Sequence, residues 1–272
     1  MSRDSSARVL EGHAVLVTGS SKGIGRTLAV GLAQNGAAVA VNYKNDEDGA
    51  HETARLITDA GTEAIVIGAD VSKPDEARRL VDEAAERLGR LDVLVNNAGR
   101  SRFSPFEDAT EEDWEDVVGT NLRGAFFASQ AAVKHMRALG KGSIVNVSSC
   151  ASVLMVVYHA AYTMSKGGLD ALTRQLAFEL APAIRVNAIA PGATGVERSR
   201  QYDPNFDESW GAVIPMDRVI EPEDLVEPVV FLASDRSAML TGDVLHVDGG
   251  WGIQGVVPPM DDFDFEADQK RG

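Results

Sequence analysis

Apolar residues occur along this chain in two alternating kinds of run. Short continuous runs predict buried strands, and longer stretches with apolar residues three or four positions apart predict helices. The predicted strands are 13–18, 37–41, 64–67, 91–96, 143–148, 184–190 and 244–247. The predicted helices are 25–35, 48–60, 73–88, 110–139, 160–180 and 221–232.

Short apolar strands separated by helices are typical of a buried parallel sheet. We therefore predict an α/β fold with a single doubly wound Rossmann-type parallel sheet and helices on both faces. One dinucleotide-binding catalytic domain is expected over residues 1–256, with an irregular substrate loop at 193–218. Residues 257–272 are rich in Asp and Glu and are interpreted as an acidic C-terminal tail.

Composition narrows the class of protein further. The 272 residues are 44% hydrophobic and 25% charged, which excludes a disordered chain, a coiled coil and a collagen-like fibre. The net charge of −15 argues against nucleic acid and anionic membranes as partners. The chain shows neither a signal-peptide pattern nor an apolar run of about 20 residues, so a cytoplasmic protein without a membrane span is expected.

The few cysteines and histidines limit the chemistry. Cys150 is the single cysteine, so an intramolecular disulfide is excluded and a reducing compartment is favoured. We interpret it as a small buried residue and not as a nucleophile. The five histidines have no metal-ligand spacing, and no metal is predicted.

A glycine-rich turn lies between the first predicted strand and the first predicted helix. Gly19, Gly23 and Gly25 have the spacing G-x3-G-x-G. Glycine lets the backbone turn tightly and approach a pyrophosphate, and the following helix presents free N–H groups to the phosphates. The turn therefore predicts a dinucleotide site.

Other stretches add to this turn in a characteristic order. They are Asn96-Asn97-Ala98-Gly99, Ser149, Tyr162-Thr163-Met164-Ser165-Lys166, Pro191-Gly192 and Val247-Asp248-Gly249-Gly250. With them, the chain resembles the short-chain dehydrogenase/reductase family from about residue 10 to residue 251. The resemblance implies an NAD(P)(H)-dependent oxidoreductase, and it implies a homotetramer built through the helices that match 110–139 and 160–180.

The resemblance also assigns the residues that hold the cofactor. They are Gly19, Ser20, Ser21, Lys22, Gly23, Ile24, Gly25, Asp70, Val71, Asn97, Ala98, Gly99, Tyr162, Lys166, Pro191, Gly192 and Thr194. Asn96 is interpreted instead as a structural residue that ties neighbouring strands together.

The end of the second predicted strand indicates which dinucleotide is used. Members that prefer NAD place an Asp there, which accepts from the ribose 2′-OH and repels a 2′-phosphate. Tyr43 stands at the matching position here, followed by Lys44, and Lys22 lies in the glycine turn. Two ammonium groups can converge on a 2′-phosphate. We therefore predict a preference for NADP, with NAD use possible.

The predicted acid–base group is Tyr162. A free phenol has a pKa of about 10, and a nearby cation lowers it. Lys166 follows at i+4, so we expect its ammonium beside the phenol and a lowered pKa. By the resemblance, Ser149 holds the substrate oxygen, Lys166 also holds the nicotinamide ribose, and Asn121 completes the proton relay. Ser148 points to the opposite face and is expected in the packing layer.

The substrate is predicted as a small molecule with a secondary alcohol or carbonyl group. A sugar or polyol is favoured because the loops contain Arg102, Arg198 and Arg200. A 3-oxoacyl-thioester reductase is the alternative, although an acidic chain is a poor match for an acidic carrier protein. A non-catalytic dinucleotide-sensing regulatory protein is the alternative from another class; such chains commonly lose the tyrosine or the lysine.

Overall fold

Seven parallel strands form one sheet in the computed structural model, which describes residues 8–254. Their order is β3-β2-β1-β4-β5-β6-β7, and every neighbouring pair is parallel. The strands are β1 (Ala14–Val17), β2 (Ala38–Tyr43), β3 (Ala64–Gly68), β4 (Val93–Asn96), β5 (Gly142–Val147), β6 (Ile184–Pro191) and β7 (Val244–Val247). The predicted doubly wound parallel sheet is confirmed.

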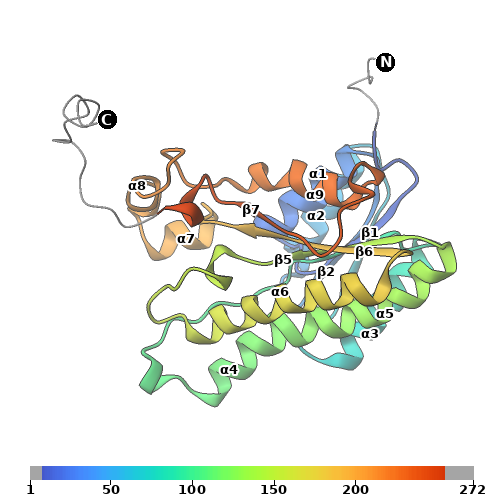
Figure 1. The fold of residues 1–272 in the computed structure, drawn as a ribbon. Coiled ribbons are helices and arrows are strands. Elements are labelled where there is room, and N and C mark those ends of the chain that lie inside the picture. The colour runs from blue at the N-terminus through green and yellow to red at the C-terminus, as the bar shows by residue number, and fades with distance from the viewer. Residues whose placement is uncertain (1–7, 255–272) are drawn as a thin grey trace, which may run out of the picture.

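Helices cover both faces of this sheet (Figure 1). One face packs against α1 (Gly23–Gln34), α2 (Glu47–Asp59) and α9 (Val226–Ala233). The other packs against α3 (Pro74–Arg87), α5 (Ala125–Leu139) and α6 (Ala160–Leu180), with α4 (Glu111–Val118) preceding α5. Successive side chains of a strand point to opposite faces of the sheet, so both faces are apolar and need a cover of helices. In β1, Val15 and Val17 pack on the face with α1, α2 and α9, and Leu16 packs on the face with α3, α5 and α6. None of the helices described is long and apolar enough to cross a membrane.

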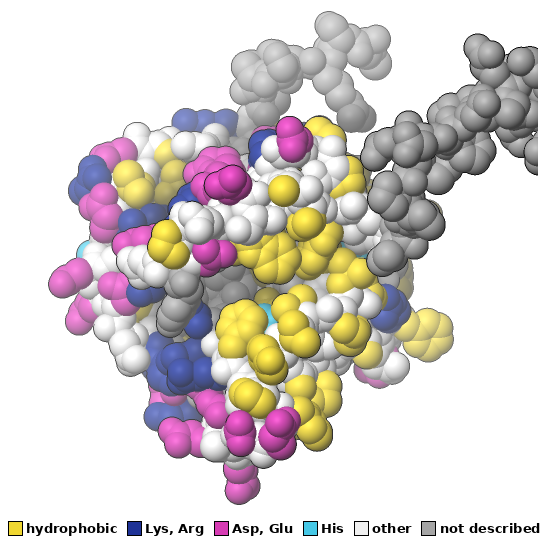
Figure 2. Space-filling model, turned by 90° about the vertical axis from the view of Figure 1, so that its left-hand side faces the viewer, with side chains coloured by type: hydrophobic (Ala, Val, Ile, Leu, Met, Phe, Trp, Pro, Cys, Tyr) yellow, Lys and Arg dark blue, Asp and Glu magenta, His cyan; other side chains and the backbone are white. Residues whose placement is uncertain are grey.

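The site lies at the carboxyl edge of the sheet. Chain connections leave β1 toward β2 on one side, and β4 lies on its other side, so the strand order reverses there. Open α/β sheets bind ligands in the crevice at such a switch point. Figure 2 views the end of the molecule near α7, α8 and the β5–α6 connection and shows a hollow with hydrophobic side chains above and below it.

Two predicted segments differ from the structure. The expected helix 110–139 is α4 and α5 joined by a π-helical turn, Gly119–Gly124. The loop 193–218 was expected to be irregular, and this is wrong, because it contains α7 (Glu197–Tyr202) and α8 (Phe206–Gly211). Each of these helices has six residues, too few for a helical period to show in the sequence.

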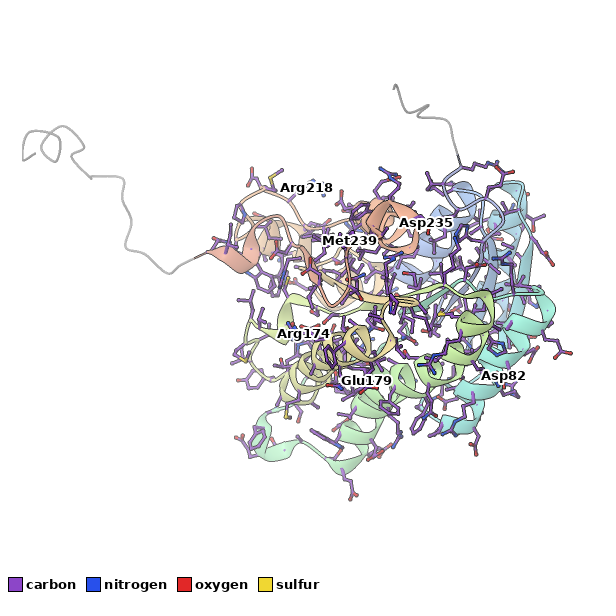
Figure 3. The ribbon with its side chains drawn as sticks, turned by 45° about the vertical axis from the view of Figure 1, so that its right-hand side comes forward. Asp82, Arg174, Glu179, Arg218, Asp235 and Met239 are labelled. Carbon is purple, nitrogen blue, oxygen red and sulfur yellow. The ribbon has the colours of Figure 1, made fainter. Side chains whose placement is uncertain are left out.

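The end of that loop is tied to the segment that leads into α9. The Arg218 guanidinium lies 2.6 and 2.9 Å from the two carboxylate oxygens of Asp224, and Arg218 is labelled in Figure 3. The predicted helix 221–232 begins here as a 3-10 turn, Pro222–Leu225, before α9. The predicted domain limits, 1–256, extend past the described residues and stay a prediction. The predicted acidic tail, 257–272, lies outside them.

Candidate active site

The glycine turn brings three backbone segments together more closely than side chains would permit. Gly19 has φ +62°, and a Cβ on it would lie 2.8 Å from the Cα of Ala98. Gly23 has φ +54°, and a Cβ on Gly25 would collide with the Gly19 carbonyl and the Asn97 amide. Glycine is therefore required at these positions by conformation and by close approach.

Two amide side chains hold the turn in place, the buried Asn42 and the partly buried Asn97. The Oδ1 atom of Asn42 accepts from the Gly19 N–H at 3.0 Å, and its Nδ2 donates to the carbonyls of Ile67 and Ala69 at 3.2 Å each. Asn97 Nδ2 donates to the Gly19 carbonyl at 2.9 Å. Sequence reasoning placed Asn97 in the groove but missed Asn42. The available signal was a single amide in an otherwise apolar strand.

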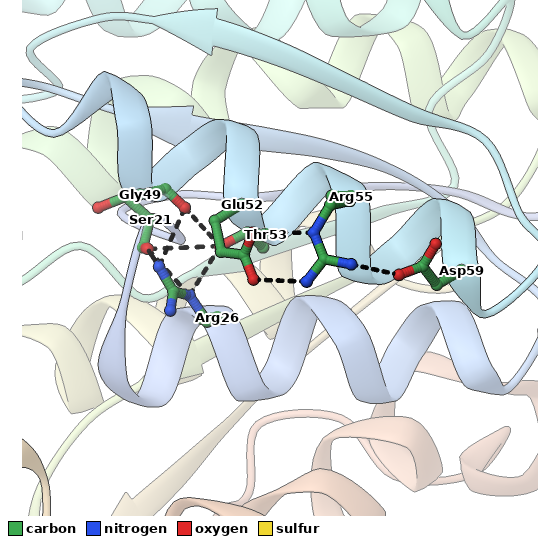
Figure 4. A network of polar contacts seen from close by, with 7 residues as sticks. All are labelled: Ser21, Arg26, Gly49, Glu52, Thr53, Arg55 and Asp59. Atoms are coloured by element: carbon green, nitrogen blue, oxygen red, sulfur yellow. Dashed lines mark hydrogen bonds and ion pairs between the residues drawn. The ribbon is translucent and has the colours of Figure 1, made fainter.

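Arg26 fixes the other side of the turn. Its Nε donates to the Ser21 carbonyl at 3.1 Å and to Thr53 Oγ1 at 3.0 Å, and its Nη2 donates to the Gly49 carbonyl at 3.1 Å (Figure 4). These contacts join the turn to α2. Sequence reasoning assigned Arg26 no role.

The cradle fits a pyrophosphate. Helix α1 begins at Gly23; within the described residues, its first turn has no acidic residue and its N-cap, Lys22, makes no side-chain cap. The N–H groups there are left for another acceptor, and a helix N-terminus favours an anion. The observation that supports this assignment is the close packing at Gly19 and Gly25, where a Cβ would collide with Ala98 and with the Gly19 carbonyl.

Both lysines near the end of β2 lie beside carboxylates. Lys44 Nζ lies 2.9 Å from Asp70 Oδ2, and Lys22 Nζ lies 4.0 Å from Asp46 Oδ2. Burial raises the pKa of Asp70, but hydrogen bonds from Ser72 and Lys44 outweigh it and hold that pKa below its ordinary value. Lys44 is therefore held at the edge of the sheet by an ionised carboxylate.

The predicted serine and tyrosine are in contact. Ser149 is the N-cap of a 3-10 turn, Cys150–Ser152, and Tyr162 lies in the first turn of α6. Burial raises the pKa of the Tyr162 phenol, and the hydrogen bond with Ser149 and the charge of Arg198 act against that rise. The net direction is upward, so the expected lowered pKa is wrong for this arrangement.

The position of Lys166 is one reason why the pKa of Tyr162 is not lowered. Its side chain is buried, and Nζ donates to the Val147 carbonyl at 2.7 Å while lying 5.6 Å from the centre of the Tyr162 ring. Burial lowers the pKa of Lys166 to about 8, although Asp170 acts to raise it. The ammonium is thus beside the ring, as predicted, but its hydrogen bond goes to the backbone.

Ser148 lies on the opposite side of the strand end, as predicted. It is 3% exposed, and its hydroxyl donates to Asp170 Oδ1 at 2.5 Å.

Cys150 is also buried, as predicted, and burial raises the pKa of its thiol. Asn96 ties strands together, since its Nδ2 donates to Asn146 Oδ1 at 2.8 Å and to Ser129 Oγ at 3.0 Å.

Asn121 lies within the π-helical turn. Its Oδ1 accepts from the Arg100 N–H at 2.7 Å, and its Nδ2 donates to the Arg100 carbonyl and to Ser165 Oγ at 2.9 Å each. A Cβ on Gly99 would lie 3.6 Å from Asn121 Oδ1 and 3.9 Å from Lys166 Nζ. The two side chains therefore flank the same point, and π-helical turns are frequent at functional sites.

The remaining predicted cofactor residues surround the same crevice. Pro191 ends β6, and Thr194 Oγ1 donates to the Gly192 carbonyl at 3.0 Å. Val71 is 6% exposed, and its carbonyl faces the backbone of Gly124 in the π-helical turn. Their contacts with a dinucleotide stay a prediction, as do those of Ser20, Ser21, Ile24 and Tyr43.

A stack of three rings leads from the surface to the phenol. His159 lies between Phe103, at a centroid distance of 4.0 Å and an angle of 15°, and Tyr162, at 4.4 Å and 13°. Its Nε2 is 2.6 Å from Ser101 Oγ, and burial lowers the pKa of His159 to about 4. The imidazole is therefore neutral at physiological pH. The sequence pattern gives no signal for this stack, because Phe103 and His159 are far apart in the chain.

Two of the three loop arginines are bound in ion pairs. Arg102 Nη2 lies 3.0 Å from Asp116, and Arg200 contacts Asp207 at 3.0 Å and Glu221 at 2.7 Å. Arg198 Nη2 donates to the Ser101 carbonyl at 3.1 Å. The positive charges of Arg102 and Arg200 are thus largely neutralised by carboxylates of the protein itself.

Comparison with known proteins agrees with the geometry. A sequence family described as enoyl-(acyl carrier protein) reductase matches residues 19–252. The chain is 42% identical over 246 residues to an uncharacterized oxidoreductase of Methylorubrum extorquens, covering 89% of this chain and 98% of that protein. It is 41% identical over 245 residues to 3beta-hydroxysteroid dehydrogenase 1 of Eggerthella lenta, covering 89% of this chain and 94% of that protein.

The solved structures include a gluconate 5-dehydrogenase from Burkholderia cenocepacia in complex with NADP and tartrate. Its TM-score is 0.86 at 36% identity, with 92% of this chain and 99% of that chain covered. The chain therefore belongs to the short-chain dehydrogenase/reductase family and is an NAD(P)-dependent oxidoreductase.

Proposed function

We propose that this enzyme interconverts a secondary alcohol and the corresponding carbonyl compound through a Ser149, Tyr162, Lys166 and Asn121 relay. The observation that carries the proposal is the hydrogen bond between Ser149 and the Tyr162 phenol, with the buried Lys166 ammonium one helical turn away. This arrangement places an acid–base group and an oxygen-binding hydroxyl side by side.

A nicotinamide dinucleotide, when bound, supplies or accepts the hydride. Gly19, Gly23 and Gly25 would hold its pyrophosphate, Asn97 would line the groove, and Lys166 would hold the nicotinamide ribose. In the direction of reduction, Ser149 donates a hydrogen bond to the substrate oxygen and Tyr162 gives its proton to that oxygen.

The raised pKa of Tyr162 sets the direction of the pH dependence. A phenol with a raised pKa is protonated at neutral pH, so it is ready to act as the acid in reduction. Oxidation needs the phenolate as base and is expected to rise with pH. Lys166, with a pKa of about 8, stays mostly protonated at neutral pH and stabilises the phenolate as it forms.

NADP is the proposed cofactor, with NAD use possible. Tyr43 leaves the end of β2 without a carboxylate side chain at the position that would repel a 2′-phosphate. A 2′-phosphate carries more charge than the Asp70 carboxylate and would draw Lys44 away from it. The Lys22→Ala and Lys44→Ala variants should lower the ratio of kcat/KM for NADP to that for NAD. An unchanged ratio in both would overturn the cofactor assignment.

A sugar or polyol remains the initial proposal for the substrate, but its support has weakened. It rested on Arg102, Arg198 and Arg200, and the ion pairs of two of them leave little charge for a polar substrate. The nature of the entrance side chains is therefore the better guide to the substrate.

The activity itself is tested with a panel of alcohols and ketones, using NADP(H) and NAD(H), on wild type and Ser149→Ala. Wild type should turn over at least one member, and Ser149→Ala should lose about 10²-fold in kcat because a hydrogen bond to developing charge is removed. NADPH affinity should be unchanged. Tight NADPH binding without turnover of any panel member would contradict the proposal and favour a dinucleotide-sensing protein.

A further inference from the structure

The entrance beside the catalytic groups has an exposed apolar wall. The connection from Ser149 to α6 carries Met155 and Val157, which are 74% and 77% exposed. Residues 148–165 contain no Asp, Glu, Lys or Arg. The Ser104 N–H donates to the Tyr158 carbonyl at 2.9 Å, which brings the segment that includes Phe103 alongside. We call Phe103, Met155 and Val157 the lower wall.

A second group of exposed apolar side chains lies on residues 213–216 and 249–254. Met216 is 68% exposed and Ile253 is 89% exposed. The Met216 N–H donates to the Gly249 carbonyl at 3.2 Å, which joins residues 213–216 to residues 249–254. Residues 209–216 carry no charge. We call Met216 and Ile253 the upper wall.

Both walls are connected to the catalytic groups. Cys150, next to Ser149, has its Sγ 3.4 Å from Asp248, just before the upper-wall segment 249–254. In the lower wall, Phe103 stacks on His159, which stacks on Tyr162. The ring stack therefore connects the lower wall to the phenol, and the Cys150–Asp248 contact ties the start of the upper-wall segment to the residue beside Ser149. Figure 2 shows hydrophobic side chains on either side of the hollow.

Exposed apolar patches of this kind mark a ligand groove or an interface. Continuity with the phenol favours a ligand groove, because a groove that ends at the reacting atom fits the body of a substrate. A polyol would lose water from its hydroxyl groups here without gaining polar side chains in return.

We propose that the two walls select secondary alcohols and ketones with a bulky, ring-containing apolar body. This inference rests on the proposed interconversion of an alcohol and a carbonyl compound, and it replaces the sugar or polyol as the substrate class. The carbonyl of such a substrate lies at Ser149 and Tyr162, and its rings lie between the lower and upper walls. Each methylene group that is buried there improves kcat/KM by about fourfold.

The test compares β-tetralone, a fused-ring ketone, with acetone and with xylitol as probes. The wild type should have a kcat/KM for β-tetralone at least about 100-fold above that for acetone, since several ring carbons are buried. Turnover of xylitol should be slower than that of β-tetralone.

Variants of the lower wall test whether its side chains cause the preference for β-tetralone. Met155→Ser and Val157→Ser should each lower kcat/KM for β-tetralone by about tenfold, and leave kcat/KM for acetone nearly unchanged. Met239→Ser is the matched control. Met239 is 97% exposed and labelled in Figure 3, and it precedes Leu240, whose carbonyl bonds Asn187 in β6, away from both walls. It should change neither rate.

The possible outcomes distinguish a wrong substrate class from a wrong proposed function. Turnover of xylitol in preference to β-tetralone would overturn the substrate class and leave the proposed function intact. Variants that alter the oligomeric state in size-exclusion chromatography, with unchanged kinetics for β-tetralone, would show that the walls contact another copy and would also overturn it. Failure of the wild type to turn over any alcohol or ketone would contradict both.

Discussion

Asn42 offers a sharp test of how the cofactor turn is built. In Asn42→Ala, the Gly19 N–H loses its acceptor, and the carbonyls of Tyr43, Ile67 and Ala69 lose the Nδ2 donor that they share. Asn42 is 2% exposed, so water cannot easily replace these partners. Oδ1 accepts one hydrogen bond and Nδ2 has two N–H groups to donate, so with about 1 kcal/mol for each of these three the free energy of unfolding should fall by about 3 kcal/mol.

The assay is thermal and urea unfolding, combined with titration of NADPH. A loss of this size lowers Tm by about 6–12 °C in a chain of this length. NADPH binding should weaken as well, because the turn is no longer fixed. Asn35→Ala is the control, since Asn35 makes one side-chain hydrogen bond, to the Gly31 carbonyl at 3.0 Å. A loss for Asn42→Ala as small as for Asn35→Ala would refute the reasoning.

Other predictions follow from single groups. Gly25→Ala should weaken NADPH binding roughly tenfold or more, as followed by nicotinamide fluorescence, because the methyl group meets the Gly19 carbonyl. His159 has a folded pKa of about 4 against 6.5 unfolded, so the free energy of unfolding should fall by about 3 kcal/mol on acidification through that window, and urea titrations of His159→Phe should show a flatter pH dependence. Asp170→Asn removes a charge that raises the pKa of Lys166, so the alkaline limb of the kcat–pH profile should move to lower pH.

Sequence periodicity was sufficient for most of the fold. Helix α6 occupies 160–180, the predicted range, because its residues form a long helical pattern between a loop and the next apolar strand. The glycine turn was found for a similar reason, since conformation and close approach leave no other residue type at Gly19. Both features depend on residues that are close together in the sequence, so the sequence alone predicts them.

The spacing of residues along the sequence could not predict the tertiary contacts. The i, i+4 spacing placed Lys166 beside Tyr162 correctly, but it could not show that Nζ bonds the Val147 carbonyl or that burial raises the phenol's pKa. The stack of Phe103 on His159 depends on a loop contact across the chain. The loop arginines supported a polar substrate in the sequence analysis because the pattern does not show their ion-pair partners, such as Asp116 for Arg102, which lies on another element.

The most direct test of the central claim is the rate of ketone reduction by Tyr162→Phe on the ketone that the wild type reduces fastest. This variant keeps the ring that stacks on His159 and removes the hydroxyl that exchanges the proton. The account predicts a fall in kcat of at least about 10²-fold, with NADPH binding and Tm close to those of the wild type. A variant that reduces the ketone at nearly the wild-type rate would contradict it.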